Sequence, residues 1–509
     1  MKATLLSELL LGRLEHASSH VAGAQSRHMN RQVYDIIRQE ILAGTLPAGS
    51  KLPASRQLAT EVGISRNTVL FAYEQLLAEG YVTAASGSGT FVTDVFAGEA
   101  GASLRRKRGD MGSPAPAQTA LPLSRRGEQL VSNASASMQQ WGAFVPGVPD
   151  VSLFPHHIWA RLLNRHWRNM PPALLTYAPP GGYLPLRRAL SEHLRLVRSV
   201  RCEPEQIVLT TGIHQSLHLI AALLGDRGDQ AWIEDPGYWG ARGVLRSASI
   251  EPVPIPVDEE GLAPSANHFA RAPKFILVSP SHQYPLGMVM SLARRQMVLE
   301  YARERDVWII EDDYDSEFRF EGRPLASLQG LDSHDRVIYT GTFSKTLFPG
   351  LRMGFMVLPK GLAERFATGL SELYREGQPH QQAVLADFIE QGHYASHVRR
   401  VRQRYAIRQR LLREAIAREF GPDWPTSTHE AGLHLVLHLP PDCDDQAISE
   451  AALREGLVAR ALSRYYHSPE RASRGLLLGY ACVPDDAIAP AFAHLAAVIR
   501  PAIASCARP

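Results

Sequence analysis

The stretch from Arg336 to Leu358, RVIYTGTFSKTLFPGLRMGFMVL, contains two apolar runs joined by a polar loop with a lysine and, seven residues later, an arginine. The runs predict buried strands. A lysine amine forms a Schiff base with an aldehyde cofactor when its position is sheltered and its pKa is low. Lys345 is therefore the candidate for this chemistry. The neighbours that suit a phosphate group are Thr342, Ser344 and Arg352.

Another apolar run lies upstream, in DVWIIEDDYDSEFRF (residues 306–320), and it is followed directly by carboxylates. Three consecutive acidic residues at the end of a strand are costly unless one of them meets a cation, and a protonated pyridine nitrogen is such a cation. For Asp313 and Asp315 we expect the simpler role of solvated residues in an acidic turn.

Short apolar runs alternate with helical patterns through the region beyond residue 136. Examples are QIVLT (206–210), QAWIED (230–235), KFILVSP (274–280) and GFMVL (354–358). This alternation predicts an α/β fold with a mainly parallel sheet and helices on both faces. After the first of these runs, a glycine turn leads into an apolar helix, whose free N-terminal amides favour phosphate. They belong to Gly212, Ile213 and His214.

The first hundred residues have a different pattern. RQVYDIIRQEIL (31–42) predicts an amphipathic helix, and SRQLATEV (55–62) and SRNTVLFAYEQLLAEG (65–80) predict two more that meet across Gly63 and Ile64. This is the helix-turn-helix layout, in which the last helix lies in the major groove of DNA. YVTAASGSGTFV (81–92) adds two strands and a glycine-serine turn, which predict a wing. The third helix is expected to turn Val69, Tyr73, Leu76 and Leu77 inward.

Polar residues at the start of the third helix can form hydrogen bonds with the DNA duplex. The glycine-serine turn of the wing allows close approach of a DNA phosphate. An arginine one helix earlier is placed to contact the DNA backbone. These candidates are, in the same order, Ser65, Arg66, Asn67 and Thr68; Gly87, Ser88 and Gly89; and Arg56.

Composition changes sharply after Val95, where Gly, Ala, Ser and Pro dominate and large apolar residues are few. We expect a winged helix-turn-helix domain over residues 26–95, a flexible linker over 96–135 and an α/β domain over 136–509.

The 509 residues carry a net charge of only +3, so charge alone names no partner. The four cysteines are scattered, which argues against a disulfide framework and a zinc site and favours a reducing cytoplasm. We expect no metal. Glu8 interrupts the apolar N-terminus, which therefore predicts an amphipathic helix, and no later run reaches the roughly 18 apolar residues of a membrane span. The sequence predicts a soluble protein without membrane contact.

Three motifs from Leu52 to Val92 occur in order: LPxSRxLA, SRxTVxxAYxxLxxEGY and GSGTFV. They resemble the winged helix of the GntR regulators. The resemblance implies binding to double-stranded DNA.

The segment around Lys345 resembles the lysine loop of fold-type I pyridoxal-phosphate enzymes, the aminotransferase class. The resemblance implies that pyridoxal 5′-phosphate is the cofactor and that Asp312 pairs with its pyridine nitrogen. It also implies that Tyr314 donates to the phenolic oxygen, although this tyrosine follows the aspartate by two residues here rather than three. In EDPGYWGAR (234–242), Tyr238 occupies the position of the aromatic ring that stacks on the pyridine.

Two further segments are similar to this class. SPSHQYPLG (279–287) takes the place of NPxNPTG, and its two extra residues leave either His282 or Gln283 to reach the cofactor's oxygen. YAPPGGYLPLRRAL (177–190) resembles a segment whose tyrosine reaches across a dimer interface to the partner's phosphate. Tyr177 is the candidate for that role.

The order of winged helix, linker and aminotransferase-like domain resembles the MocR group of GntR regulators from about Arg31 to the end of the chain. This resemblance implies a domain-swapped homodimer and an operator with paired sites that match its two-fold symmetry.

Two arginines that bind substrate carboxylates in related proteins are absent from their expected places. Leu477 stands where an RLSF-like strand has its arginine, and Gly240 stands where a γ-aminobutyrate-responsive MocR member has a second one. The nearby loop offers Arg464, Arg471 and Arg474 as substitutes.

Loss of carboxylate binding disfavours transamination and favours sensing, because an unpaired buried carboxylate is costly. We expect a transcription regulator whose effector is pyridoxal phosphate itself or, as a second hypothesis, an amine or amino acid that reacts with the bound cofactor. The alternatives are a working aminotransferase with an appended DNA-binding module and a scaffold that binds DNA without cofactor.

Overall fold

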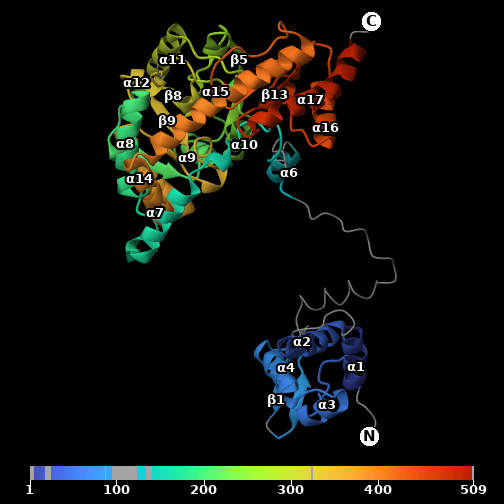
Figure 1. The fold of residues 1–509 in the computed structure, drawn as a ribbon. Coiled ribbons are helices and arrows are strands. Elements are labelled where there is room, and N and C mark those ends of the chain that lie inside the picture. Colours follow the sequence, from blue (N-terminus) through green and yellow to red (C-terminus); the bar gives the residue numbers. More distant parts are fainter. Residues whose placement is uncertain are drawn as a thin grey trace. The chain divides into compact units, whose positions relative to one another are not determined.

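The computed structural model describes residues 5–17, 25–85, 87–94, 123–132, 140–322, 325–375 and 377–506. The chain divides into two compact units, Met1–Pro122 and Leu123–Pro509 (Figure 1). The domain limits expected from the sequence stay a prediction, because most of the expected linker lies outside the described residues. The described part of that stretch, residues 123–132, contains the helix α6 (Arg125–Ser132).

The N-terminal unit is the winged helix-turn-helix that the sequence predicts. Gly63 joins its third and fourth helices with a left-handed φ of 73°, a conformation that favours glycine. The two strands pair antiparallel, with Val82 opposite Val92, and form the wing. Its elements are α1 (Leu5–Ala17), α2 (Gln25–Ala43), α3 (Ser55–Val62), α4 (Arg66–Ala78), β1 (Val82–Ala85) and β2 (Gly89–Val92).

The core of this unit lies between its helices. Val33 and Ile37 of α2 are buried with Val69 and Leu76 of α4 in one cluster. The prediction that Leu77 also faces inward is wrong, since this side chain is 45% exposed. Consecutive residues of a helix point about 100° apart, so burial of Leu76 turns Leu77 toward the surface.

The C-terminal unit is built on an eight-stranded sheet with the order β3-β10-β9-β8-β7-β4-β5-β6. The run from β9 to β5 is parallel, whereas β10 pairs antiparallel with both of its neighbours and β6 pairs antiparallel with β5. The predicted mainly parallel sheet is confirmed. Its strands are β3 (Ile207–Thr210), β4 (Gln230–Asp235), β5 (Glu251–Asp258), β6 (Gly261–Leu262), β7 (Phe275–Val278), β8 (Trp308–Asp313), β9 (Val337–Thr342) and β10 (Gly354–Val357).

Helices cover both faces of this sheet, because successive side chains of a strand point to opposite sides. In β10, Phe355 and Val357 pack with α7, α8 and α14, whereas Met356 packs with α9, α10 and α13 on the other face. The helices are α7 (His156–Arg168), α8 (Leu184–Arg198), α9 (Ile213–Leu224), α10 (Trp239–Ser247), α11 (Leu292–Arg305), α12 (Leu328–Leu331), α13 (Lys360–Tyr374) and α14 (Pro379–Glu390).

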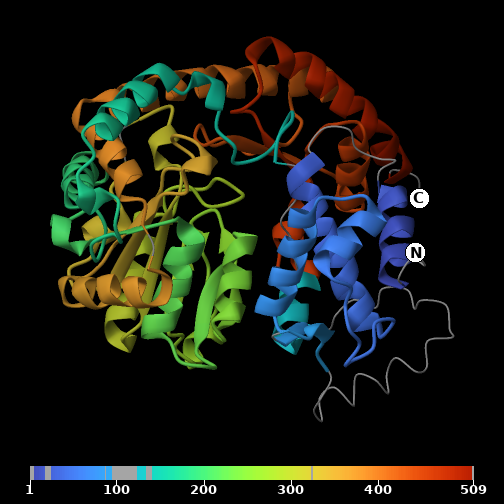
Figure 2. The same cartoon turned by 90° about the horizontal axis from the view of Figure 1, so that it is seen from below.

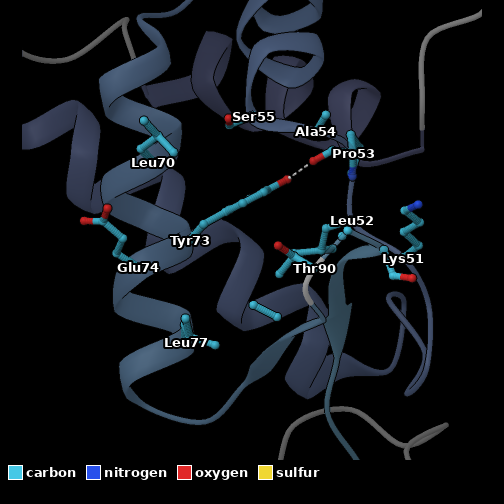
Figure 3. A pocket seen from close by; sticks show the side chains of 14 residues that line it. Lys51, Leu52, Pro53, Ala54, Ser55, Leu70, Tyr73, Glu74, Leu77 and Thr90 are labelled. Atoms are coloured by element: carbon cyan, nitrogen blue, oxygen red, sulfur yellow. Dashed lines mark hydrogen bonds between the residues drawn. The ribbon is translucent and has the colours of Figure 1, made fainter.

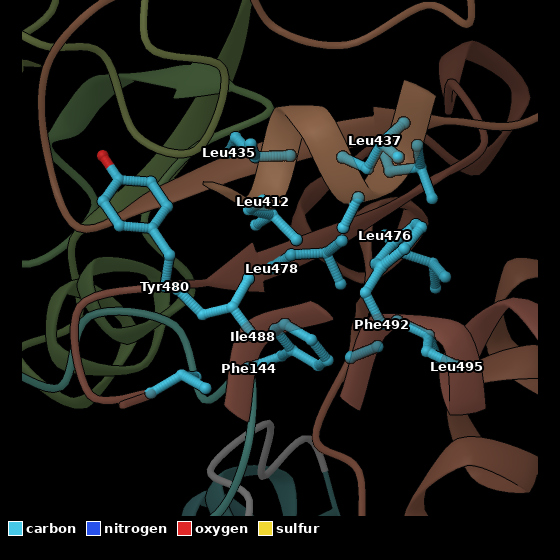
Figure 4. Packing of buried hydrophobic residues seen from close by; sticks show 14 of the residues in the cluster. Phe144, Leu412, Leu435, Leu437, Leu476, Leu478, Tyr480, Ile488, Phe492 and Leu495 are labelled. Carbon is cyan, nitrogen blue, oxygen red and sulfur yellow. The ribbon is translucent and has the colours of Figure 1, made fainter. Parts of the chain in front are cut away.

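A three-stranded antiparallel sheet, β11-β13-β12, forms the C-terminal part of the same unit. The long helix α15 packs against α14 at one end and α17 at the other (Figures 1 and 2). Phe144, Leu412, Leu476 and Phe492 are fully buried together beneath this sheet (Figure 4). The elements are β11 (His434–His438), β12 (Arg460–Ala461), β13 (Gly475–Gly479), α15 (His393–Phe420), α16 (Asp445–Arg454) and α17 (Asp485–Cys506).

By length and composition, α17 is apolar enough to cross a membrane, contrary to the expectation that no segment reaches this threshold. The core helix of a folded domain passes the same test. Ile488, Phe492, Leu495 and Ile499 lie at helical spacing and are all fully buried in the core of this unit. This packing accounts for the apolar face of α17.

Candidate functional site

Lys345 lies in the loop after β9 and is half-buried. Its Nζ donates a hydrogen bond to the carbonyl of Gly147 at 2.8 Å. Burial lowers the pKa of the Lys345 amine, while the carboxylates of Asp315 and Asp312 act in the opposite direction. A lowered pKa leaves more of the amine unprotonated and able to attack an aldehyde.

Asp312 and Asp313 are neighbours at the end of β8 and point to opposite faces of the sheet. The buried Asp313 accepts hydrogen bonds on Oδ2 from Nε of Arg198 at 2.7 Å and from the hydroxyl of Tyr339 at 2.5 Å. The carboxylate of Asp312 makes no hydrogen bond or ion pair with any residue that the structure describes, although its main chain belongs to the β8–β9 ladder. Burial, together with the charge of Asp313, raises the pKa of Asp312 to about 7. A cationic group beside Asp312 would therefore be stabilised.

The expectation that Asp313 and Asp315 are solvated turn residues is wrong. Asp315 is buried, and both of its carboxylate oxygens lie 3.0 Å from Nδ1 of His282. The same nitrogen lies 3.0 Å from the hydroxyl of Tyr314. Because the charge of Asp315 also raises the pKa of Lys345, this group of three side chains belongs to the surroundings of the lysine.

The two alternatives in the 279–287 loop differ in their contacts. The amide nitrogen of Gln283 donates to the carbonyls of Pro236 and Tyr284 at 2.8 Å each, and its amide oxygen accepts from the backbone N–H of Leu286 at 3.1 Å. Gln283 thus holds the main chain of the loop together. His282 contacts Asp315 and Tyr314 with one ring nitrogen, and which of the two residues reaches a cofactor stays a prediction.

Tyr238 precedes α10, and its hydroxyl lies 2.7 Å from Nε2 of His214 on α9. Burial raises the pKa of Tyr238, and the charges of Asp312 and Arg352 also act on it in opposite directions. Residues from four separate strand ends therefore surround one site.

The N-terminus of α9 has the geometry that the sequence predicts. Gly212 caps the helix with a φ of 127°, and Ile213 and His214 form its first turn. The pKa of His214 is lowered first by burial and then by the charge of Arg352, which places a guanidinium close to this helix end. A cavity of about 310 Å³ is lined in part by Arg352 and Thr211. Cationic charge and helix amides thus converge where an anion can bind.

The remaining predicted cofactor residues are Thr342 at the end of β9, Ser344 in the loop that follows, and Tyr177. Thr342 and Ser344 flank the lysine, and the hydroxyl of Thr342 accepts a hydrogen bond from the backbone N–H of Ser344 at 3.2 Å. Tyr177 is 77% exposed. This exposure is compatible with a contact to a second copy of the chain.

The two positions of the absent arginines are filled. A Cβ on Gly240 would lie 2.5 Å from Nε2 of His214 and 2.6 Å from the ring of Tyr238, so no larger side chain fits unless these groups move. Leu477 is fully buried in a cluster that includes Trp239.

The substitutes in the nearby loop are poorly placed. Arg464 and Arg471 are exposed, and Arg474 lies 3.7 Å from the buried Asp445. None of the three has a described contact with Lys345 or its surroundings.

The predicted DNA-binding residues form an exposed polar surface at the start of α4 and on the wing. Ser65 caps α4, with its Oγ accepting from the backbone N–H of Thr68 at 3.1 Å. Thr68 itself is buried and lies 2.9 Å from the hydroxyl of Ser65, so it supports the helix start. The other predicted residues are all exposed, namely Arg56, Arg66, Asn67, Gly87, Ser88 and Gly89.

A cavity of about 380 Å³ lies between α4, the wing and residues 51–55 (Figure 3). The hydroxyl of Tyr73 donates to the carbonyl of Pro53 at 2.9 Å and fixes the spacing between α4 and this segment. Leu77, Lys51 and Gly89 contribute to the walls. The exposed side chain of Leu77 therefore lines the cavity between α4 and the wing.

Several residues of the site carry no sequence signal of their own. Gly147 meets Lys345 across 198 residues of chain. Burial and the charge of His282 lower the pKa of His434 to about 3, which keeps this buried imidazole neutral. Arg460, which lies in none of the motifs quoted from the sequence, is close enough to lower the pKa of Lys345 by its charge. Only the pairing of distant strands brings these residues together.

Comparison with protein families matches both units. Residues 29–92 match the bacterial regulatory proteins of the gntR family, and residues 152–491 match aminotransferase class I and II.

Relatives along nearly the whole chain are regulators. The chain is 41% identical over 89% of its length to the probable rhizopine catabolism regulatory protein MocR of Rhizobium meliloti, covering 90% of that protein. It is 32% identical over 90% of its length to the pyridoxine biosynthesis transcriptional regulator PdxR of Corynebacterium glutamicum, covering 93% of it.

Solved structures match the C-terminal unit. The α-aminoadipate aminotransferase LysN of Thermus thermophilus has a TM-score of 0.68 at 25% identity, over 75% of this chain and all of that one. The Pyrococcus horikoshii kynurenine aminotransferase has a TM-score of 0.65 at 25% identity, over 75% of this chain and 95% of that one. The C-terminal unit therefore has the fold-type I aminotransferase fold.

Proposed function

Because this chain belongs to the MocR-type regulators of the GntR family, we propose that it is a transcription regulator that binds pyridoxal 5′-phosphate on Lys345 and responds to it. The observation that carries this proposal is that the amine of Lys345, whose pKa is lowered by burial, lies within electrostatic reach of the Asp312 carboxylate, which has no hydrogen bond or ion pair with any described residue. The first group suits an aldehyde and the second suits a protonated pyridine nitrogen.

The chemistry of the donor set fits this cofactor. When bound, pyridoxal phosphate supplies an aldehyde that condenses with amines and a ring that withdraws electrons. Asp312 would hold the ring nitrogen, Tyr238 would lie against the ring, and Tyr314 with His282 would face its phenolic oxygen. The phosphate would be held by the start of α9 and the lysine loop, through Gly212, Ile213, His214, Thr342, Ser344 and Arg352.

Sensing fits the site better than transamination does. Gly240 has no room for an arginine, and Leu477 is apolar, so both carboxylate-binding positions of related proteins are lost. Pyridoxal phosphate is the leading effector in this proposal, and an amine or amino acid that meets the bound cofactor is the second. In the expected domain-swapped homodimer, Tyr177 would reach the phosphate of the second copy, and the two winged helices would bind paired operator sites. The expected compartment is the cytoplasm.

The direct test is footprinting on the DNA upstream of the protein's own gene, with and without pyridoxal phosphate. We expect a footprint over paired sites that changes with the cofactor, and loss of the footprint in Arg66→Ala. An identical footprint in both conditions would refute pyridoxal phosphate as the effector.

The alternative function is a working aminotransferase with an appended DNA-binding module. This alternative stays open because both Lys345 and Asp312 are present. Rapid conversion of amino acids to keto acids by the purified protein, without sequence-selective binding to DNA, would establish this alternative.

A further inference from the structure

A second cavity of the C-terminal unit, of about 200 Å³, lies between α8, the segment after β8 and α15. None of the residues proposed to hold the cofactor lines it. Its walls carry four arginines and one carboxyl group, namely Arg198, Arg319, Arg399, Arg402 and Glu317. His193 also lines the cavity, and burial lowers its pKa, so its imidazole is neutral at pH 7.

The positive charge of this cavity is not balanced by the protein. Arg198 donates from Nε to Oδ2 of the buried Asp313 at 2.7 Å, so its charge is paired. Arg319, Arg399 and Arg402 have no side-chain hydrogen bond or ion pair with any residue in the described part of the chain. Three guanidinium groups therefore face the cavity without a counter-charge.

Glu317 supplies little negative charge to offset them. Burial, followed by the charge of Asp313, raises the pKa of Glu317 to about 7, so its carboxyl group is only partly ionised at neutral pH. The hydroxyl of Tyr394 donates to this carboxyl group at 3.3 Å. The cavity thus remains strongly cationic.

The three unpaired arginines come from two elements. Arg399 and Arg402 are three residues apart on α15, so they lie on the same face of the helix, where like charges repel each other. Arg319 follows the short helix η5 (Ser316–Phe318) and lines the cavity from there. Its Nε is buried and has no hydrogen-bond partner within the described residues. A buried donor without an acceptor is costly, and an anion in the cavity would supply the acceptor.

We propose that this cavity binds the phosphate group of a small ligand through Arg319, Arg399 and Arg402. Guanidinium groups bind phosphate oxygens with paired N–H donors, and a phosphate offers three oxygens to three arginines, whereas a carboxylate offers two. A cavity of about 200 Å³ suits a small anion, whereas duplex DNA needs an open surface. The site is separate from the proposed cofactor site and does not depend on it.

The test is calorimetric titration of the full-length protein loaded with pyridoxal phosphate, which fills the phosphate site proposed at the start of α9. The probes are inorganic phosphate, glycerol 3-phosphate and uncharged glycerol, at an ionic strength kept constant with sodium chloride. The variants are Arg399→Ala, Arg402→Ala and Arg319→Gln. The matched control is Arg410→Ala, which removes an exposed arginine of α15 that pairs with Glu414 instead.

We expect saturable binding of one equivalent of phosphate or glycerol 3-phosphate to the wild type, and no binding of glycerol. Each of the three cavity variants should weaken this binding roughly 10- to 100-fold, which is the range for hydrogen bonds to a charged group. Arg410→Ala should bind like the wild type. Tighter binding of glycerol 3-phosphate identifies a phosphorylated metabolite as the ligand, and tighter binding of inorganic phosphate identifies the free ion.

The inference is overturned if neither phosphate compound binds saturably, or if all three cavity variants bind like the wild type. It is also overturned if Arg399→Ala and Arg402→Ala weaken binding to a non-operator DNA duplex while phosphate binding is unchanged, because these arginines then contact DNA. If Arg319→Gln does not fold, the two variants on α15 decide, since Arg399 is exposed and Arg402 is half-buried.

Failure of the wild type to take up pyridoxal phosphate refutes the proposed function and leaves this inference open to test. The titration is then made in an Arg352→Ala background, in which the site at the start of α9 is weakened. Phosphate binding that the cavity variants still reduce in this background supports the inference, and binding that they leave unchanged overturns it.

Discussion

The two units of the molecule hold their binding groups in opposite ways. On the winged helix, Arg56, Arg66 and Asn67 are exposed, and nothing in the folded unit has to move for DNA to reach them. In the aminotransferase-like unit, Lys345 and Asp312 lie in surroundings that shift both of their pKa values. A hydrated polyanion needs an accessible surface, whereas a small cofactor needs a site from which water is excluded. The second arrangement costs stability until the ligand binds.

The largest expected effect is on cofactor binding. Lys345→Ala should abolish the visible absorbance band that appears when the wild type is mixed with pyridoxal phosphate, because Lys345 is the lysine that the described residues place in the loop after β9. The measurement is an absorbance spectrum after removal of free cofactor. Lys360→Ala, an exposed lysine at the start of α13, is the control and should keep the band. An intact band in Lys345→Ala would contradict the site.

Asp313→Asn should cost about 3–5 kcal/mol of unfolding free energy, because it leaves the buried guanidinium of Arg198 without its counter-charge. Denaturant unfolding of the cofactor-free protein measures this. A loss below about 1 kcal/mol would mean that Arg198 finds another acceptor or water.

Arg66→Ala should weaken binding to operator DNA by roughly 10- to 100-fold without changing the stability of the winged helix, since the side chain is exposed. Fluorescence anisotropy with labelled operator at fixed salt gives the affinity. Arg31→Ala removes an exposed arginine of α2 and serves as the matched control. Equal losses in both variants would point to general charge rather than to the start of α4.

Asp312→Asn should stabilise the cofactor-free protein by about 1–2 kcal/mol at pH 8. The pKa of Asp312 is raised from 3.8 to about 7, so the folded protein binds more protons than the unfolded one between these values. The contribution of Asp312 to stability is therefore fully present below about pH 4 and lost as pH rises through 7. Unfolding curves from pH 5 to pH 8 should show the gain of Asp312→Asn shrinking toward pH 5. A gain that does not depend on pH would contradict the assigned pKa.

Gly240→Ala is expected to have the smallest effect, a loss of roughly 10-fold in cofactor affinity. The new methyl group would displace the ring of Tyr238, which is proposed to lie against the cofactor. Gly243→Ala, for which the added Cβ has open space, is the control on the same helix. Unchanged affinity in Gly240→Ala would show that Tyr238 does not need its present position.

Much of the fold was predictable because its signals are local. The helix-turn-helix and wing follow from contiguous motifs, and the parallel sheet follows from apolar runs of strand length. The same local reading assigned the wrong role to Asp313 and Asp315, because their partners, Arg198 and His282, lie 115 and 33 residues away along the chain.

The candidate site likewise contains residues with local sequence signals and residues that only long-range contacts bring in. Lys345 and the start of α9 could be placed from their own sequence neighbourhoods. Gly147 could not, because it meets Lys345 across 198 residues of chain. The contacts that distinguish His282 from Gln283 likewise depend on backbone carbonyls that their own sequence neighbourhood does not place.

The hydrogen bond from Lys345 to Gly147 links the state of the lysine amine to the main chain of a distant segment. Gly147 belongs to the segment, described from residue 140 onward, that follows the expected linker in sequence. Two residues away, the main chain of Val145 lies within 2.0 Å of where a Cβ on Gly479 would be, so this segment is held tightly against β13. Any ligand that takes the amine of Lys345 competes with Gly147 for it. Loss of this hydrogen bond would therefore free one contact of a turn that directly follows the bridge residues Ala143 and Phe144.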